Sequence, residues 1–117
     1  MDAAVKRKWV EALRSGKYEQ GKGRLRTLDN HFCCLGVLYD IVKPEAWKQG
    51  TFYYLADGFG GALTIDFEDN VNLPYKQSNI LMGMNDIGKS FNEIADWIEQ
   101  NIPCTTTHNG SNPSPAG

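Results

Sequence analysis

The sequence contains no long apolar run, no obvious targeting segment and only two histidines. No apolar stretch approaches the roughly 18–20 residues that a membrane-spanning helix needs, so no membrane span is predicted. The N-terminal segment does not resemble a signal peptide, because Lys6, Arg7 and Lys8 lead into an amphipathic segment and not into a continuous apolar core. We therefore expect a cytoplasmic protein.

Cysteine and histidine are too few and too scattered to predict metal or redox chemistry. Of the three cysteines, Cys33 and Cys34 are adjacent, a spacing at which a disulfide between them would be strained. There is no C-x-x-C pair, and His31 and His108 have no ligand spacing between them. His31 beside either neighbouring cysteine suggests a base and a nucleophile, but no third group that would orient the base is evident. We expect buried thiols, no metal, no cofactor, no catalytic residues and a protein that is not an enzyme.

The chain length fits one domain with a polar tail. At 117 residues, about two-thirds of the unfolded surface can be buried in one core. We expect residues 1–102 to form this single globular domain. Residues 103–117 are rich in Thr, Asn, Ser, Gly and Pro without apolar periodicity, which predicts a flexible polar tail.

Apolar spacing and capping residues predict about four helices. A capping box of Ser90 and Glu93 begins the last one, and Asp2 is the expected N-cap of the first. A glycine-containing stretch, residues 83–88, is expected to end the third. The predicted helices cover residues 3–15, 32–42, 75–82 and 91–101, with a short helical turn at 44–47.

Strand signals lie mainly in the centre of the chain. Residues 51–55 are aromatic and β-branched, and residues 62–67 alternate between apolar and polar side chains. With the glycine-rich loop 57–61 between them, they predict a β-hairpin. A short strand is also expected near 24–28. The predicted fold class is therefore α+β, with the helices packed on a small antiparallel β-sheet or hairpin.

Charge is distributed unevenly. Residues 1–26 contain eight Lys or Arg and three Asp or Glu, a net charge of +5, whereas the rest of the chain carries −7. The positive part ends in residues 20–26, Gln-Gly-Lys-Gly-Arg-Leu-Arg, which we name the basic loop. Flexible backbone beside three cations is what an anion site needs, although the spacing of the glycines matches neither a P-loop nor a dinucleotide fingerprint. A surface loop whose cations balance the acidic remainder is the alternative.

From the basic loop we predict non-enzymatic binding of a small, nucleotide-like anion. The loop cations would neutralise phosphates, the glycine amides would allow close approach, and a hairpin tyrosine would stack on the base. Packing in the core is the alternative for the aromatic rings. The predicted ligand-binding residues are Gly21, Lys22, Gly23, Arg24, Arg26, Tyr53 and Tyr54.

Two other kinds of partner can be weighed. An acidic C-terminal helix with Trp97 as anchor predicts docking onto another protein as an inhibitor, and homo-oligomer formation stays open. Residues 80–98 are similar to the first two helices of a helix-turn-helix, but a recognition helix does not follow and the segment is acidic. Because phosphates repel acidic surfaces, nucleic acid is the weakest candidate partner.

Three motifs together suggest an origin. They are W-V-x-A-L-R-S-G-x-Y-x-Q-G-x-G-x-L at residues 9–25, C-C-L-G-V-L at 33–38 and M-N-D-x-G-x-S-F-x-E-I-A-D-x-I-E at 84–99. This pattern resembles a set of small proteins of tailed bacteriophages and prophages. The resemblance implies a protein made in the host bacterial cytoplasm and supplies no catalytic residues. By analogy of origin, it implies an accessory protein that counters host defences, by sequestering a nucleotide signal or by binding a host protein.

Overall fold

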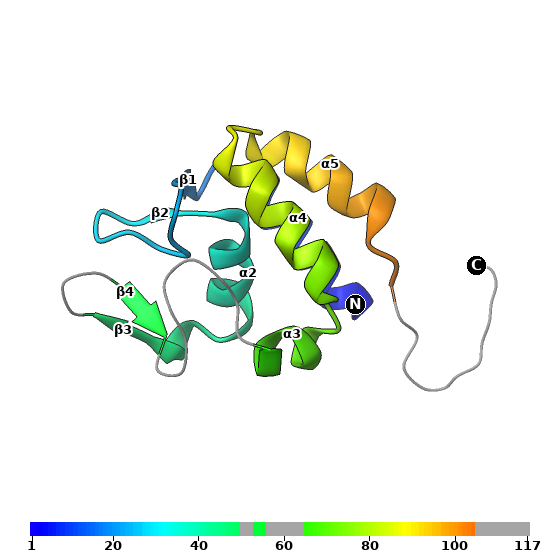
Figure 1. The fold of residues 1–117 in the computed structure, drawn as a ribbon, viewed down its shortest axis with the longest axis horizontal. Coiled ribbons are helices and arrows are strands. Elements are labelled where there is room, and N and C mark those ends of the chain that lie inside the picture. The colour runs from blue at the N-terminus through cyan, green and yellow to red at the C-terminus, as the bar shows by residue number, and fades with distance from the viewer. Residues whose placement is uncertain (50–52, 56–64, 105–117) are drawn as a thin grey trace.

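Helices make up most of the computed structural model, which describes residues 1–49, 53–55 and 65–104 (Figure 1). Short strands occur only in the part of the described chain that precedes α3. In chain order the elements are α1 (Ala3–Arg14), β1 (Glu19–Gln20), β2 (His31–Phe32), α2 (Cys34–Val42), the 3-10 helix η1 (Pro44–Ala46), β3 (Trp47–Gln49), β4 (Tyr53–Leu55), α3 (Ile65–Val71), α4 (Tyr75–Asp86) and α5 (Phe91–Asn101).

The core lies between four of the helices. Helix α1 packs against α2 and α5, and α4 packs against both α2 and α5. Trp9 of α1 is fully buried, and its indole Nε1 donates a hydrogen bond of 2.9 Å to the carbonyl oxygen of Cys34 in α2. In Figure 1 the two small sheets lie on one side of α2, and α4 and α5 lie on the other. Helix α2 is therefore the central element, and its residues Cys34 to Tyr39 are all buried.

Each sheet contains two strands. Strands β1 and β2 are parallel, with Glu19 opposite His31, whereas β3 and β4 are antiparallel, with Trp47 opposite Leu55. On the other side of β2, residues 25–27 approach in the antiparallel direction through an isolated bridge between Arg26 and Phe32. The basic loop thus connects two segments that flank β2.

The capping signals locate two helices correctly. The Asp2 side chain accepts a hydrogen bond of 3.0 Å from the Val5 N–H, and the capping box of Ser90 and Glu93 is formed at the start of α5. Helix α2 also confirms the predicted buried helix. The predicted break at 83–88 is wrong in its position, because α4 continues through Gly83 to Asp86. One exposed helical glycine costs only about 1 kcal/mol, and burial of residues on the opposite side of α4 offsets that cost.

The predicted hairpin is wrong in its second strand. Residues Ile65–Val71 form helix α3, and Phe67 and Val71 are buried at the i, i+4 spacing of a helix. Alternation of apolar and polar residues over only six positions does not distinguish a strand from a helix. The first strand is confirmed at Tyr53–Leu55, but its partner is β3. Residues 51–52, 56–64 and 105–117 lie outside the described residues, and so does most of the predicted tail.

The β-structure also differs from the single antiparallel sheet predicted. One of the two sheets is parallel, and the strand expected near 24–28 is reduced to the bridge at Arg26. The small domain is nevertheless α+β.

Helix α2 runs directly against the backbone of the basic loop. A Cβ atom on Gly36 would overlap the carbonyl group of Leu25. That carbonyl oxygen accepts a hydrogen bond of 3.2 Å from the Cys33 N–H, at the start of α2. It cannot move aside without breaking this bond, so close packing requires glycine at position 36.

Replacing two helical glycines by alanine should change stability in opposite directions. For Gly36→Ala we expect the free energy of unfolding to fall by about 3 kcal/mol or more, because the Leu25 backbone must shift. At Gly83 an added Cβ meets no atom within 4 Å. Gly83→Ala should therefore raise the free energy of unfolding by about 0.5–1 kcal/mol. Denaturant unfolding measures both, and two changes of the same sign would contradict the packing described for the two helices.

Candidate functional site

The backbone of the basic loop is bound to the protein itself. The Gly21 N–H donates to the Phe32 carbonyl oxygen at 2.8 Å, and the Gly23 N–H donates to Asp86 Oδ1 at 3.3 Å. Gly23 has a φ of +79°, a conformation that favours glycine. Both glycine amides therefore have internal partners, and the Asp86 carboxylate lies where an external anion was expected.

The three loop cations have different surroundings. Arg26 donates from Nε and Nη2 to Asn30 Oδ1 at 3.1 and 2.7 Å, and its Cζ lies 5.1 Å from the ring centroid of Phe32 and 5.5 Å from that of Trp47. These contacts hold its guanidinium over aromatic faces. Lys22 and Arg24 are exposed. Of the three predicted ligand-binding cations, Arg26 is therefore half-buried against Phe32 and Trp47, whereas the other two are exposed.

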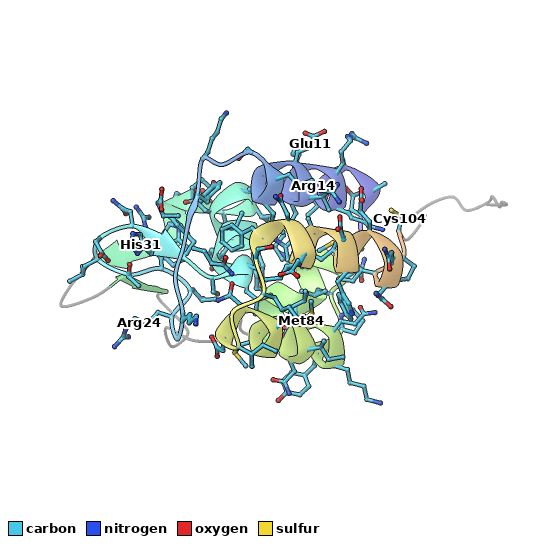
Figure 2. All side chains as sticks on the ribbon, turned by 90° about the horizontal axis from the view of Figure 1, so that it is seen from above. Glu11, Arg14, Arg24, His31, Met84 and Cys104 are labelled. Carbon is cyan, nitrogen blue, oxygen red and sulfur yellow. The ribbon has the colours of Figure 1, made fainter. Side chains whose placement is uncertain are left out.

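The basic loop lies beside the C-terminal end of α4. The Lys22 ammonium is 3.9 Å from the position that a Cβ atom on Gly88 would occupy. A helix C-terminus carries partial negative charge, so this cation stabilises the end of α4. Figure 2 shows Arg24 and Met84 toward one edge of the molecule, and Glu11 and Arg14 toward the opposite edge.

The predicted stacking residues are placed only by their backbone. Tyr53 and Tyr54 lie on β4, opposite Gln49 and Lys48 of β3. Their side chains lie outside the described part of the structure. Strand β3 begins with Trp47, whose ring lies under Arg26, so the strand pair adjoins the end of the basic loop. Base stacking by a tyrosine stays a prediction.

Asn85 is a buried polar residue that sequence reasoning missed. Its Oδ1 accepts from the Cys34 N–H at 3.1 Å and from Gln20 Nε2 at 3.0 Å, and its Nδ2 donates to the Gly21 carbonyl at 2.7 Å. Gln20 Nε2 also donates to the Lys89 carbonyl at 2.7 Å. One fully buried side chain therefore joins α4, α2 and the basic loop. The available signal was its position four residues after Leu81, on the buried face of the same helix.

The Asn85→Ala variant should be strongly destabilised. It leaves the Cys34 N–H and the Gly21 carbonyl buried without partners, each at a cost of about 1–3 kcal/mol. We expect the free energy of unfolding to fall by about 2–4 kcal/mol. Asn79→Ala, at an exposed position of the same helix, is the matched control and should change it by less than about 0.5 kcal/mol. Urea denaturation compares the two variants, and equal losses would contradict the role given to Asn85.

A second polar cluster fixes the aromatic side of the molecule. The Tyr18 hydroxyl donates to Asp40 Oδ2 at 2.7 Å, and Trp47 Nε1 donates to Asp40 Oδ1 at 3.0 Å. Desolvation and then this hydrogen bond raise the pKa of Tyr18 to about 12. Both carboxylate oxygens are thus used to position the rings around Phe32, which packs edge-on against Tyr18 with centroids 4.9 Å apart. The cluster is structural.

The adjacent thiols are part of the core. The Cys33 Sγ accepts from the Gly36 N–H at 3.4 Å as N-cap of α2, and the Cys34 Sγ donates to the Leu81 carbonyl at 3.5 Å. Burial raises the pKa of Cys33 to about 11 and that of Cys34 well above its ordinary value. A cysteine nucleophile needs the opposite shift. Within the described residues, no group of three His, Cys, Asp or Glu side chains could hold a metal ion.

Alkylation should distinguish the three thiols. At pH 8 only about one Cys33 side chain in a thousand is a thiolate, because its pKa is about 11. Cys104 is exposed. We therefore expect iodoacetamide to modify the folded protein once, at Cys104, and the unfolded protein at all three cysteines. Intact-mass measurement counts the labels, and modification of Cys33 or Cys34 at the rate of Cys104 would contradict their burial.

The predicted anchor on α5 is largely used within the molecule. Trp97 is half-buried and packs against the core. Arg14 of α1 forms ion pairs with Asp96 and, at 2.9 Å, with Glu99. The hydrogen bond from Arg14 lowers the pKa of Glu99. The acidic side of α5 is thus partly neutralised by α1, beside an open groove of about 670 Å³ that Val10 and Cys104 help to line.

Apolar side chains are instead exposed on α4. Among the described residues, four large apolar side chains are exposed, and three of them belong to α4 or its C-cap. They are Tyr75 (67% exposed), Ile80 (48%) and Ile87 (76%), with Leu28 (46%) on the hairpin before β2. Gly83 is also exposed, and Met84 is half-buried. We name Ile80, Gly83, Met84 and Ile87 the α4 face.

These features define a small α+β domain with an exposed helix face and a basic loop. The chain belongs to the family described as "Domain of unknown function (DUF8296)", which matches residues 1–60. The match covers α1 to β4, including the basic loop, and ends before α3. No curated protein and no solved structure matches the chain. None of the described helices is both long enough and apolar enough to span a bilayer.

Proposed function

We propose that this protein is a non-enzymatic, phage-encoded accessory protein that binds a host protein through the α4 face. The observation that carries the proposal is the alignment of exposed apolar side chains on α4. Single exposed apolar residues are common, but several gathered on one surface are typical of interaction sites. Ile80 lies in α4 and Ile87 is its C-cap, with its N–H still bonded to the Gly83 carbonyl. They are seven residues apart, about two helical turns, and therefore lie on the same side of α4.

The proposal of a phage origin rests on the resemblance of the three motifs to those of small phage and prophage proteins. Their host is bacterial, so the partner would be a protein of the bacterial cytoplasm. Small phage proteins of this kind commonly act by blocking a host factor, and a host-defence component is the target class that we propose. The α4 face replaces Trp97 as the anchor, because Trp97 is half-buried against the core whereas Ile87 is exposed.

Two aspartate substitutions of matched exposure test this function. We expect a stoichiometric complex when the tagged protein is incubated with lysate of its bacterial host. Ile80→Asp should weaken the complex at least tenfold, because a charge replaces an apolar contact. Leu28→Asp is the control, since Leu28 is 46% exposed and Ile80 48% exposed. Size-exclusion chromatography of the purified complex gives the stoichiometry. Absence of a complex, or equal losses in both variants, would argue against the α4 face.

The exposed cations Lys22 and Arg24 support a second function, the sequestration of a small phosphorylated ligand. The ligand would be held by these side chains, since the glycine amides are already hydrogen-bonded. Lys89, also exposed, lies in the turn that follows α4. Ion pairs to phosphate would supply the affinity.

Calorimetric titration with nucleotides and cyclic nucleotides tests this second function. Binding should disappear in the Lys22→Ala/Arg24→Ala double variant and persist in Lys8→Ala, which removes an exposed cation of α1. Arg26 is left intact because its contacts with Phe32 and Trp47 are structural. No heat of binding with any nucleotide would rule this function out.

A further inference from the structure

We propose that the occupant of the α4 face is an acidic amphipathic helix of the partner protein, packed closely over Gly83. This inference rests on the proposed protein-binding function and specifies its partner. Three independent features support it: the spacing of the exposed side chains, the position of Gly83 and the charges at the ends of the helix.

The exposed side chains form a straight stripe along α4. Lys76, Ile80, Gly83 and Ile87 follow one another at intervals of four, three and four residues. This is the spacing of the contact positions in a coiled coil, where two helices lie side by side. The stripe is about 16 Å long at 1.5 Å per residue. Such a surface fits a second helix of about three turns, lying nearly parallel or antiparallel to α4.

Packing among the described residues does not require the glycine in this stripe. A Cβ atom on Gly83 would meet no atom within 4 Å, and Gly83 is not among the residues with positive φ. Gly36, by contrast, is required by the Leu25 carbonyl. A glycine on an exposed helix face removes side-chain bulk and lets a partner backbone approach. We therefore infer that the close approach at Gly83 comes from outside the molecule.

The charges beside the stripe favour an acidic partner. Residues 75–90 contain Lys76, Lys89 and a single acid, Asp86, whose carboxylate accepts the Gly23 N–H. Lys22 adds a further cation beside Gly88. Exposed Glu93 at the start of α5 lies close enough to Lys89 for that lysine to lower its pKa. The surroundings of the stripe therefore carry three lysines against two acids, a small positive excess in a chain with a net charge of −2. Glutamates along the flanks of a partner helix would lie opposite these lysines.

A second copy of the chain fits less well. Two α4 faces brought together would place lysines near lysines, which is repulsive. Of the acidic residues of α5, Asp96 and Glu99 are already paired with Arg14, and Glu93 accepts the Ser90 N–H in the capping box. The same charges disfavour a basic or nucleic-acid-binding segment of a host protein as the occupant.

Two designed peptides test the inference directly. Both are 21-residue amphipathic helices with the same apolar seam of leucine and alanine, but one carries glutamate on its flanks and the other lysine. Fluorescence anisotropy should show the acidic peptide binding at least tenfold more tightly at low salt. The difference should shrink as ionic strength rises, because the flanking charges are exposed. Equal binding of the two peptides, or binding of neither, would overturn the proposal.

Variants at Gly83 test whether the acidic peptide binds at this position and whether its affinity changes independently of the stability of the fold. Gly83→Leu should lower the affinity for the acidic peptide at least tenfold. Gln100→Leu, at an exposed position of α5, should leave that affinity unchanged. Gly83→Ala should raise the melting temperature and still weaken binding. An unchanged affinity in Gly83→Leu would contradict close packing at this position.

The two proposals can fail separately. If the host complex forms and is lost in Ile80→Asp while the acidic peptide does not bind, the α4 face binds a protein but not this kind of helix. If no host complex forms, the proposed function itself fails. Sedimentation that shows a dimer of this chain, broken by Gly83→Leu, would identify a second copy as the occupant and overturn the acidic-helix proposal.

Discussion

The side-chain amide of Asn85 is the interaction on which the arrangement of this molecule depends. It lies fully buried and bonds the start of α2, the backbone of the basic loop and the side chain of Gln20. A neutral amide suits this position, because it donates to one backbone carbonyl and accepts from one backbone N–H with the same side chain. A single residue therefore fixes the relative positions of α2, α4 and the basic loop, which are distant in the sequence.

This arrangement changes the interpretation of the basic loop. The glycines that suggested an anion site have their N–H groups directed toward Phe32 and Asp86, so the loop acts as a structural connection between β1, β2 and α4. Lys22 of this loop lies beside Gly88, just after the C-terminal end of α4, where a cation interacts favourably with the helix dipole. The loop then supports the α4 face by supplying charge next to an apolar stripe. Lys22 contributes to both proposed functions. Beside the α4 face it would attract an acidic partner, and together with Arg24 it would bind a phosphate.

Local signals were sufficient for α1 and α5, but not for α3 or for the contacts between segments. Asp2 and Ser90 cap α1 and α5 through bonds to residues three positions ahead, so a short window of sequence contains the whole interaction. The parallel pairing of β1 with β2, and the helix at residues 65–71, depend on packing against distant parts of the chain. The sequence analysis did not predict the α4 face, because only the structure shows which side of the helix is covered and that Ile80 and Ile87 are exposed.

The packing of α1 against α5 has a consequence for how the chain folds. Arg14 and the Asp96–Glu99 pair lie more than 80 residues apart, and Lys6 donates to the carbonyl of Ile102 at 2.6 Å. Helix α1 is synthesised well before α5, so one of its two packing partners is missing until α5 has been made. Closing so long a loop costs conformational entropy before any contact is gained, which slows folding. Until α5 is made, the part of α1 that packs against α5 stays uncovered, and this exposed apolar surface favours aggregation or chaperone binding.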